Sequence, residues 1–191
     1  VLKMSKRPVV LVVMDGVGIS DSEFGNAVKK AYKPTLDNLW ENSPHTEIKA
    51  HGLAVGLPTD DDMGNSEVGH NALGCGQIYS QGAKLGNENI ETGEIFKTET
   101  WSGLVNNCKD GKMHFLGLLS DGNVHSHINH LKALIKKAKE DGVKEVRVHA
   151  LLDGRDVPET SALTYVDDIE AYMAELNDDS FHACIASGGG R

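Results

Sequence analysis

Short runs of apolar residues recur along the chain, and each run ends at a polar segment that contains glycine. Runs of this length that are closed by glycine-containing turns are typical of strands, and the most continuous ones are typical of strands buried on both faces. The pattern predicts four strands, at residues 9–14, 114–119, 146–152 and 184–186.

Two segments between these runs have the spacing of amphipathic helices. Apolar residues recur at helical intervals over residues 128–138 and 163–176. Gly142 follows the first segment as a stop signal, and Thr160 or Ser161 can cap the second. Strands that alternate with helices predict an α/β fold with a parallel sheet, in which ligands bind beyond the carboxyl ends of the strands.

The stretch from residue 52 to residue 93 follows neither pattern. It is rich in glycine, has few aromatic residues and shows weak periodicity. This change of composition suggests a domain boundary between residues 79 and 84, although composition alone does not fix it.

The overall composition fits a globular protein and argues against several kinds of partner. Hydrophobic residues make up 39% of the 191 residues and charged residues 25%, so the chain can bury a substantial core. Lys and Arg number 19 and Asp and Glu 28, which gives a formal charge of −9. Nucleic acids and anionic membranes bind clustered positive charge, so we expect neither as a partner.

The cysteines and the first apolar run bear on the cellular compartment. The three cysteines are widely spaced and form no Cys-x-x-Cys pair, so they predict neither a disulfide framework nor a thiolate zinc site. The apolar run at residues 9–14 is too short for the core of a signal peptide, and no stretch has the length of a membrane span. We therefore expect a cytoplasmic protein.

Two polar residues are candidates for metal or phosphate chemistry. Asp15 follows the strongest predicted strand and is placed to bind a metal, although an Asp-Gly turn is the simpler explanation of the residues alone. Ser66 follows a Gly-Asn turn and precedes residues that can begin a helix, where unpaired backbone N–H groups favour phosphate. The alternative, which the spacing favours, is that Ser66 is only an N-cap with Glu67 in the first turn.

Histidines and arginines follow the later predicted strands. His125, His127 and His130 lie close enough in sequence to ligate zinc, but histidines after a strand more often bind substrate or cap the next helix. Arg155 and Asp156 come after another strand, where arginine can hold a phosphate or carboxylate and aspartate can accept from hydroxyls. The alternative for this pair is a surface ion pair.

Five motifs occur in order along the chain: MDGVG (14–18), MGNSEVGH (63–70), SDGNVHSH (120–127), DGRD (153–156) and SGGGR (187–191). Each motif alone is weak, but five in this order are not expected by chance. The same order is found in cofactor-independent phosphoglycerate mutases, which the chain resembles over nearly its whole length.

The resemblance implies a fold and a reaction. It implies a parallel-sheet, three-layer phosphatase-like domain of the alkaline phosphatase superfamily, with residues 1–80 as its first part. Residues 81–191 would be the first part of an inserted α/β domain that binds substrate. The family interconverts 3- and 2-phosphoglycerate through a phosphoserine, needs two divalent metal ions (manganese, cobalt or magnesium) and does not use 2,3-bisphosphoglycerate.

The resemblance also implies roles for individual residues. Ser66 would be the nucleophile and a metal ligand, and Asp15 a second metal ligand. The substrate would be held by His125, Arg155, Asp156 and Arg191. Family members are more than twice as long, so we expect this chain alone to be an inactive fragment of a protein that is a monomer when complete.

Two other functions remain as alternatives. Another enzyme of the alkaline phosphatase superfamily, such as a phosphatase or a phosphopentomutase, would share Asp15 and the nucleophile but would leave His125 and the Arg155-Asp156 pair unexplained. A non-catalytic module that grips anions through Arg155 and Arg191 would have no use for Asp15 and Ser66 together.

Overall fold

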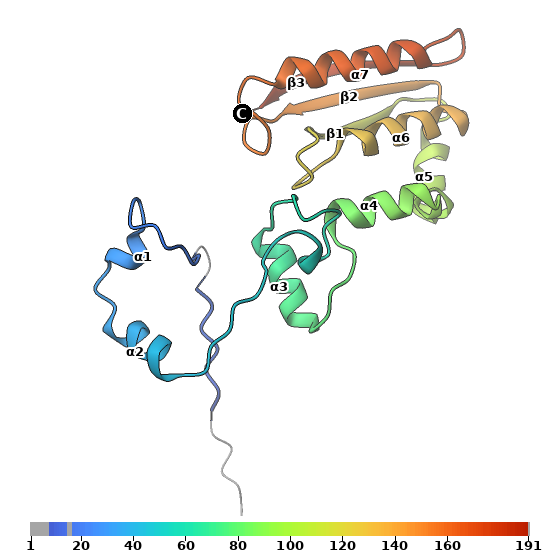
Figure 1. Ribbon diagram of the computed structural model, residues 1–191. Helices are drawn as coiled ribbons and strands as arrows, with labels where there is room; N and C mark the ends of the chain where they lie inside the picture. Colours follow the sequence, from blue (N-terminus) through green and yellow to red (C-terminus); the bar gives the residue numbers. More distant parts are fainter. Residues whose placement is uncertain (1–7, 15–16, 191) are drawn as a thin grey trace, which may run out of the picture. The chain divides into compact units, whose positions relative to one another are not determined.

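The computed structural model describes residues 8–14 and 17–190 and divides the chain into two compact units, Val1–Ile48 and Lys49–Arg191 (Figure 1). Asp15 and Arg191 lie outside the described residues. Within the described part of the chain, no helix is both long enough and apolar enough to cross a membrane.

The first unit contains two short helices, α1 (Ala27–Lys30) and α2 (Pro34–Asn42). Asn26 caps α1 by accepting a hydrogen bond from the backbone of Lys29, and the proline that starts α2 has the fixed φ that suits a first helical turn. Neither helix buries a residue, so this unit has little apolar packing of its own in the described residues.

The strand predicted at residues 9–14 does not form. These residues have no regular secondary structure, and Val9 and Leu11 are 94% and 86% exposed. A strand is stable only where neighbouring strands satisfy its backbone and cover its apolar side chains. Among the described residues of the first unit there is no strand for it to pair with.

The second unit begins with the glycine-rich stretch, which is mostly helical. Its turns depend on glycines, because a Cβ on Gly56 would lie 1.9 Å from the carbonyl oxygen of Tyr79. The elements that follow one another here are η1 (Gly52–Val55), α3 (Ser66–Cys75), α4 (Gly82–Glu91), η2 (Glu94–Lys97) and α5 (Glu99–Asn107).

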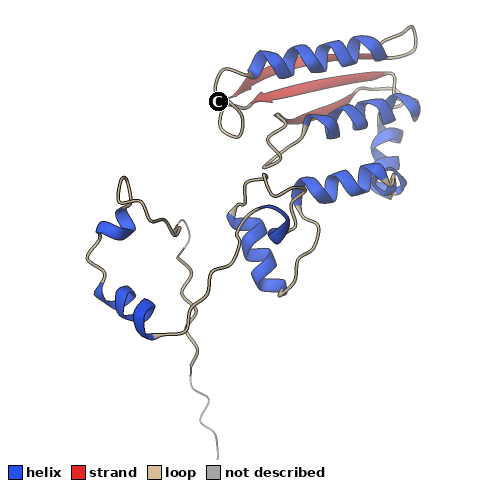
Figure 2. Ribbon diagram, viewed as in Figure 1, coloured by secondary structure: helices blue, strands red, loops and turns tan. Residues whose placement is uncertain are grey.

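The rest of this unit is a parallel three-stranded sheet with the order β1-β2-β3, drawn in red in Figure 2. The predicted α/β fold class is therefore confirmed, as are three of the four predicted strands and both predicted helices. In chain order the elements are β1 (Met113–Leu119), α6 (Ile128–Glu140), β2 (Glu145–Leu152), α7 (Ala162–Leu176) and β3 (His182–Gly190).

The helix ends are formed largely as the sequence predicts. Gly142 follows α6 with a left-handed φ of 89°, which glycine adopts without steric cost. Ser161 occupies the N-cap position of α7, but its hydroxyl donates to the carbonyl of Pro158 and makes no cap hydrogen bond to the helix.

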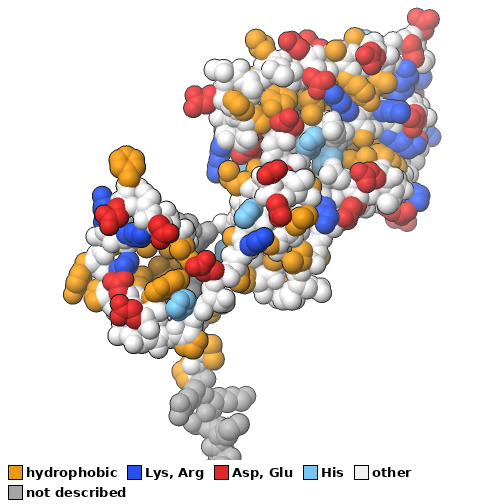
Figure 3. All heavy atoms as spheres, in the orientation of Figure 1, with side chains coloured by type: hydrophobic (Ala, Val, Ile, Leu, Met, Phe, Trp, Pro, Cys, Tyr) orange, Lys and Arg blue, Asp and Glu red, His pale blue; other side chains and the backbone are white. Residues whose placement is uncertain are grey.

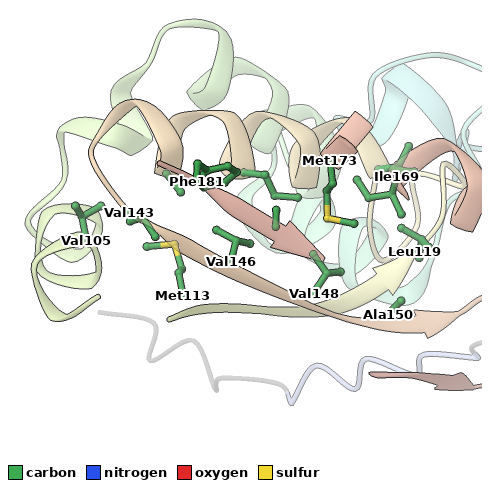
Figure 4. Packing of buried hydrophobic residues seen from close by; sticks show 14 of the residues in the cluster. Val105, Met113, Leu119, Val143, Val146, Val148, Ala150, Ile169, Met173 and Phe181 are labelled. Atoms are coloured by element: carbon green, nitrogen blue, oxygen red, sulfur yellow. The ribbon is translucent and has the colours of Figure 1, made fainter. Parts of the chain in front are cut away.

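One continuous hydrophobic core joins α6 and α7 to the sheet. Figure 4 shows Ile169 and Met173 of α7 together with Val146 and Val148 of β2 in this cluster. Ile135 of α6 is completely buried in the same cluster. Apolar burial on this scale is the main force that fixes the strands and therefore the loops at their carboxyl ends.

The sheet is buried on one face only, whereas the sequence predicted strands buried on both faces. Alternate residues of β2 such as Val146 and Ala150 are buried, but Leu116 of β1 is 73% exposed and Leu151 of β2 is 45% exposed. In a sheet with the order β1-β2-β3, two successive right-handed crossovers place both helices on the same side. The other side is therefore left without a helix among the described residues.

Acidic and basic side chains are intermixed on the visible face of the second unit (Figure 3). Several form ion pairs, and the pair of Lys132 on α6 and Asp168 on α7, whose closest atoms are 2.7 Å apart, joins two helices. Exposed pairs of this kind contribute little to stability, so the core dominates the folding of this unit.

Candidate active site

Ser66 is the first residue of α3, and the cap of this helix is its neighbour. The side-chain oxygen of Asn65 accepts a hydrogen bond from the backbone N–H of Val68 at 3.1 Å, and Asn65 has the extended backbone of an N-cap. The alternative that Ser66 is only an N-cap is therefore wrong. Ser66 is exposed at the positive end of the helix dipole, where a phosphoryl group can be bound.

The Gly-Asn turn before Ser66 is fixed by a close backbone contact. A Cβ on Gly64 would lie 1.8 Å from the carbonyl oxygen of Ala50, so no residue larger than glycine fits there. Behind the turn, Val68 of α3 packs with Val55 and Leu57 in a small buried cluster. The start of α3 is thus held by both backbone and side-chain contacts.

Gln81, just before α4, is buried, and its side chain forms hydrogen bonds with η1 and α3. Its side chain is 5% exposed, and its Nε2 donates hydrogen bonds to the carbonyls of Val55 (2.9 Å) and Val68 (3.2 Å). Asn71 of α3 donates to its Oε1 at 2.9 Å. A buried amide with these partners ties η1 and α3 to the start of α4.

The carboxyl ends of β1 and β2 are joined by a buried pair of polar side chains. Ser120 donates a 2.7 Å hydrogen bond to Oδ2 of Asp153, and the two residues are 1% and 2% exposed. Oδ1 of Asp153 accepts from the backbone N–H groups of Arg155 (2.9 Å) and Asp156 (3.2 Å). Asp153 therefore shapes the turn that carries the predicted substrate residues.

The loop after β1 bends tightly around Asp156. A Cβ on Gly122 would lie 2.8 Å from Cβ of Asp156, and the backbone N–H of Gly122 donates to the hydroxyl of Ser120 at 3.0 Å. The next residue, Asn123, has a φ of 60°, a conformation that asparagine adopts more readily than most residues.

His125, Arg155 and Asp156 lie together beyond the ends of β1 and β2. Nε2 of His125 is 3.9 Å from Oδ2 of Asp156, whose side chain is 7% exposed, while the imidazole is 55% exposed. Arg155 is exposed at the surface of the same turn. A histidine, an arginine and a carboxylate at one edge of a parallel sheet can bind an anion that also carries hydroxyl groups.

His127 and His130 have structural roles and do not form a zinc site with His125. His127 is the N-cap of α6, and its Nδ1 accepts from the backbone N–H of Asn129 at 3.1 Å. Nε2 of His130 lies 2.6 Å from Oδ1 of Asn87 on α4. Burial lowers the pKa of His130 below its usual value, and the nearby His127 lowers it further. In the described part of the chain, no three His, Cys, Asp or Glu side chains converge as metal ligands.

Tyr165 of α7 forms a hydrogen bond with the loop that follows β1. Its hydroxyl donates a 2.6 Å hydrogen bond to Asp121, and this bond together with partial burial raises the pKa of Tyr165 to about 12. The tyrosine therefore stays protonated over the physiological range and remains a hydrogen-bond donor to the loop.

Asp62 and Asn123 connect the segment before Ser66 with the loop before His125. Nδ2 of Asn123 donates to Oδ1 of Asp62 at 2.9 Å. Oδ2 of Asp62 accepts from the backbone N–H and the hydroxyl of Thr59, at 2.6 and 2.9 Å. The sequence alone assigns no role to these two residues or to Ser120 and Asp153, although all but Asp62 lie within the quoted motifs, because no spacing pattern relates positions so far apart.

A cavity of about 160 Å³ lies between α4 and this loop. Its lining includes Gly82, Gly86, Asn123, His125 and His130. Oδ1 of Asn123 is buried and has no hydrogen-bond partner among the described residues.

The fold and the site define an α/β protein whose polar groups gather at the carboxyl edge of a parallel sheet. A model of the N-terminal part of BPG-independent phosphoglycerate mutases matches residues 87–191, which is more than half of the chain. The chain belongs to the family of 2,3-bisphosphoglycerate-independent phosphoglycerate mutases.

Individual relatives are similar over most of the chain. A probable 2,3-bisphosphoglycerate-independent phosphoglycerate mutase of Leptospira interrogans is 50% identical over 200 residues, which cover 100% of this chain and 36% of the relative. The enzyme of Trypanosoma brucei brucei is 48% identical over 191 residues, which cover 98% of this chain and 35% of the relative.

A solved structure has a similar fold as well as a similar sequence. The phosphoglycerate mutase of Leishmania mexicana, described at low cobalt concentration, superposes with a TM-score of 0.81 at 47% identity. The match covers 94% of this chain and 33% of that structure. The chain thus spans about a third of the length of the relatives that it matches.

Proposed function

We propose that the protein containing this chain interconverts 3-phosphoglycerate and 2-phosphoglycerate through a phosphoserine at Ser66. The observation that carries the proposal is the family membership of the chain, combined with an exposed serine at the start of α3 and a polar cluster at the ends of β1 and β2. The substrate has a phosphate, a carboxylate and a hydroxyl, which is the chemistry that such a cluster can bind.

In the first step, the hydroxyl oxygen of Ser66 attacks the phosphorus of 3-phosphoglycerate. A new Ser–O–P bond forms, the bond from phosphorus to the 3-oxygen breaks, and the proton of Ser66 ends on the 3-hydroxyl of glycerate. The N–H groups at the start of α3 favour the negative charge of phosphoserine, because they point toward it and carry the positive end of the helix dipole.

In the second step, bound glycerate turns so that its 2-hydroxyl faces phosphoserine and accepts the phosphoryl group. We assign the retention of glycerate to His125, Arg155, Asp156 and Arg191. Arginine suits the carboxylate, while His125 and Asp156 suit the hydroxyls. Water must be excluded during this step, because it would hydrolyse phosphoserine and turn the mutase into a phosphatase.

We also propose that the complete protein binds divalent metal ions, with Asp15 and Ser66 among their ligands. The structure of the Leishmania mexicana relative was described with cobalt, which supports a divalent ion of this kind. A metal at Ser66 would stabilise the serine alkoxide and neutralise phosphoryl charge. Because this chain spans about a third of the length of its relatives, we propose that the other ligands belong to the rest of the protein.

The test is a comparison of substrates with the full-length protein supplied with manganese, cobalt or magnesium. We expect 2-phosphoglycerate to form from 3-phosphoglycerate without added 2,3-bisphosphoglycerate and without release of inorganic phosphate. Isomerisation of pentose phosphates, or steady release of phosphate, would assign the site to the alternative enzymes of the superfamily. Binding of anions without turnover or metal binding would indicate the non-catalytic module.

The same assay tests the proposal that residues 1–191 alone are inactive. We expect no conversion by this chain with any of the three metals, because it spans about a third of its relatives. We further propose that the complete protein is a monomer. We also propose a cytoplasmic location, which the three free cysteines support. Light scattering and cell fractionation would measure these two properties.

A further inference from the structure

We propose that Asn123 is a positioning residue that couples the Ser66 segment to the substrate loop through its hydrogen bond to Asp62. This inference rests on the proposed function. The bond is 2.9 Å long and joins residues 61 positions apart in the sequence. Asp62 comes four residues before Ser66, and Asn123 comes two residues before His125. The bond therefore links the segment that precedes the proposed nucleophile to the loop that precedes a proposed substrate ligand.

The Asp62 end of this link is rigid. Asp62 is 9% exposed, and its second carboxylate oxygen accepts two hydrogen bonds from Thr59. Its backbone carbonyl accepts from the N–H of Gly52 at 3.1 Å, which fixes it to η1. Val55 of η1 packs with Val68 of α3. A displacement of Asp62 should therefore also displace the helix that begins at Ser66.

The Asn123 end is equally constrained. Gly122, its neighbour, is pressed against Asp156 and is hydrogen-bonded to Ser120. Ser120 in turn is bonded to Asp153 at the end of β2. The backbone at Asn123 is therefore fixed relative to both substrate-binding turns, and this limits where the side-chain amide can lie.

An asparagine at position 123 has two disadvantages that its hydrogen bond offsets. A φ of 60° is a conformation that glycine adopts at lower cost, and Oδ1 of Asn123 is buried without a partner among the described residues. Glycine would avoid both. Among the described residues, the hydrogen bond to Asp62 is the contribution of this side chain that glycine cannot supply.

The expected consequence is a change in rate rather than in affinity. If the hydrogen bond between Asn123 and Asp62 holds Ser66 in line with the substrate, loss of that bond leaves the substrate ligands in place. The hydroxyl of Ser66 then spends less time in the position for attack. A misplacement of about 1 Å can lower the rate on the order of 100-fold. KM should change little, because ground-state contacts to the substrate remain.

Asn123→Gly in the full-length protein is the first test, because glycine keeps the left-handed backbone and removes only the amide. We expect kcat to fall by roughly 10- to 100-fold with a nearly unchanged KM. The matched control is Thr59→Val, which removes a hydroxyl bonded to the same carboxylate but leaves the link to Asn123. Its kcat should stay close to that of the unaltered protein, because the backbone N–H of residue 59 still donates to Oδ2 of Asp62 and keeps it in place.

An exchange of the two partners provides a rescue. Asn123→Asp places a carboxylate against Asp62 and should lower kcat further than Asn123→Gly. Adding Asp62→Asn restores a donor and an acceptor in reversed order, since the new amide can donate to position 123 while its oxygen still accepts from Thr59. Recovery of kcat in the double variant supports the link.

Two results would overturn the proposal: an unchanged kcat in Asn123→Gly, or a double variant no faster than Asn123→Asp. If the unaltered protein lacks mutase activity, the proposed function fails, and amide hydrogen exchange of the 191-residue chain then tests the link alone. Asn123→Gly should speed exchange in residues 56–66 and 120–127 more than Thr59→Val does. Equal exchange in the two variants would reject the link.

Discussion

The hydroxyl of Ser120 and the carboxylate of Asp153 form a 2.7 Å hydrogen bond across the carboxyl ends of β1 and β2. Both side chains are almost completely buried. Because the other oxygen of Asp153 accepts from the backbone of Arg155 and Asp156, this single bond connects the loop after β1 with the turn after β2. The proposed substrate residues are carried by these two segments.

Replacing Ser120 by alanine should therefore lower the free energy of unfolding. The change removes the donor to Asp153 and the acceptor of the Gly122 N–H, so we expect a loss of about 1–3 kcal/mol. Urea denaturation of the 191-residue chain measures it. Ser102→Ala is the control, because Ser102 is exposed and its loss should cost no more than about 0.5 kcal/mol. Equal losses in the two variants would contradict the assigned role.

Gly122→Ala should disturb the site through steric contact. The added Cβ would come within 2.8 Å of Cβ of Asp156 and 3.1 Å of its carbonyl oxygen, and the backbone offers little room to move. We expect a destabilisation of about 1–3 kcal/mol and weaker substrate binding by the full-length protein. Gly117→Ala in β1 meets no atom within 4 Å and should be tolerated. A Gly122→Ala protein that binds and unfolds normally would refute the packing argument.

The bond from Tyr165 to Asp121 should be visible in a pH titration. Since the pKa of Tyr165 is raised from 10.0 to about 12, its contribution to stability is fully present below pH 10 and is lost as the pH rises from 10 toward 12. The chain has four tyrosines, so the difference between the ultraviolet titrations of the unaltered chain and Tyr165→Phe isolates this group.

Asp121→Asn supplies the control for this titration. It removes the charge and the strong acceptor, which are the larger cause of the shift, so the pKa of Tyr165 should move back toward 10. A Tyr165 that ionises near pH 10 in the unaltered chain, or one that does not respond to Asp121→Asn, would show that the bond does not form in solution.

Local patterns were sufficient to predict the sheet and its helices. The apolar periodicity of α6 and α7 and the three apolar runs of β1, β2 and β3 each reflect burial against one shared core, so sequence and structure agree there. The run at residues 9–14 has the same local pattern but no strand beside it among the described residues of its unit. Strand formation depends on pairing with another strand, which is a tertiary property, and the lack of such a strand among the described residues explains why residues 9–14 are not a strand.

The site was predictable in part. His125, Arg155 and Asp156 were expected at the strand ends, and the structure brings them together there. The contact of Asn123 with Asp62 could not be inferred, because it depends on how the turn before α3 packs against the loop after β1. The roles of Asp15 and Arg191 stay predictions, since both lie outside the described residues.

Identification of the phosphorylated residue tests the proposed phosphoserine at Ser66 most directly. Full-length protein supplied with manganese and 3-phosphoglycerate is quenched in acid, digested and analysed by mass spectrometry. We expect one phosphoryl group on the peptide that contains Ser66, its absence in Ser66→Ala and its persistence in Ser102→Ala. Alanine suits the first turn of α3 and Asn65 still caps that helix, so the fold should survive the change. Phosphate on another residue, or labelling that persists in Ser66→Ala, would contradict the central claim.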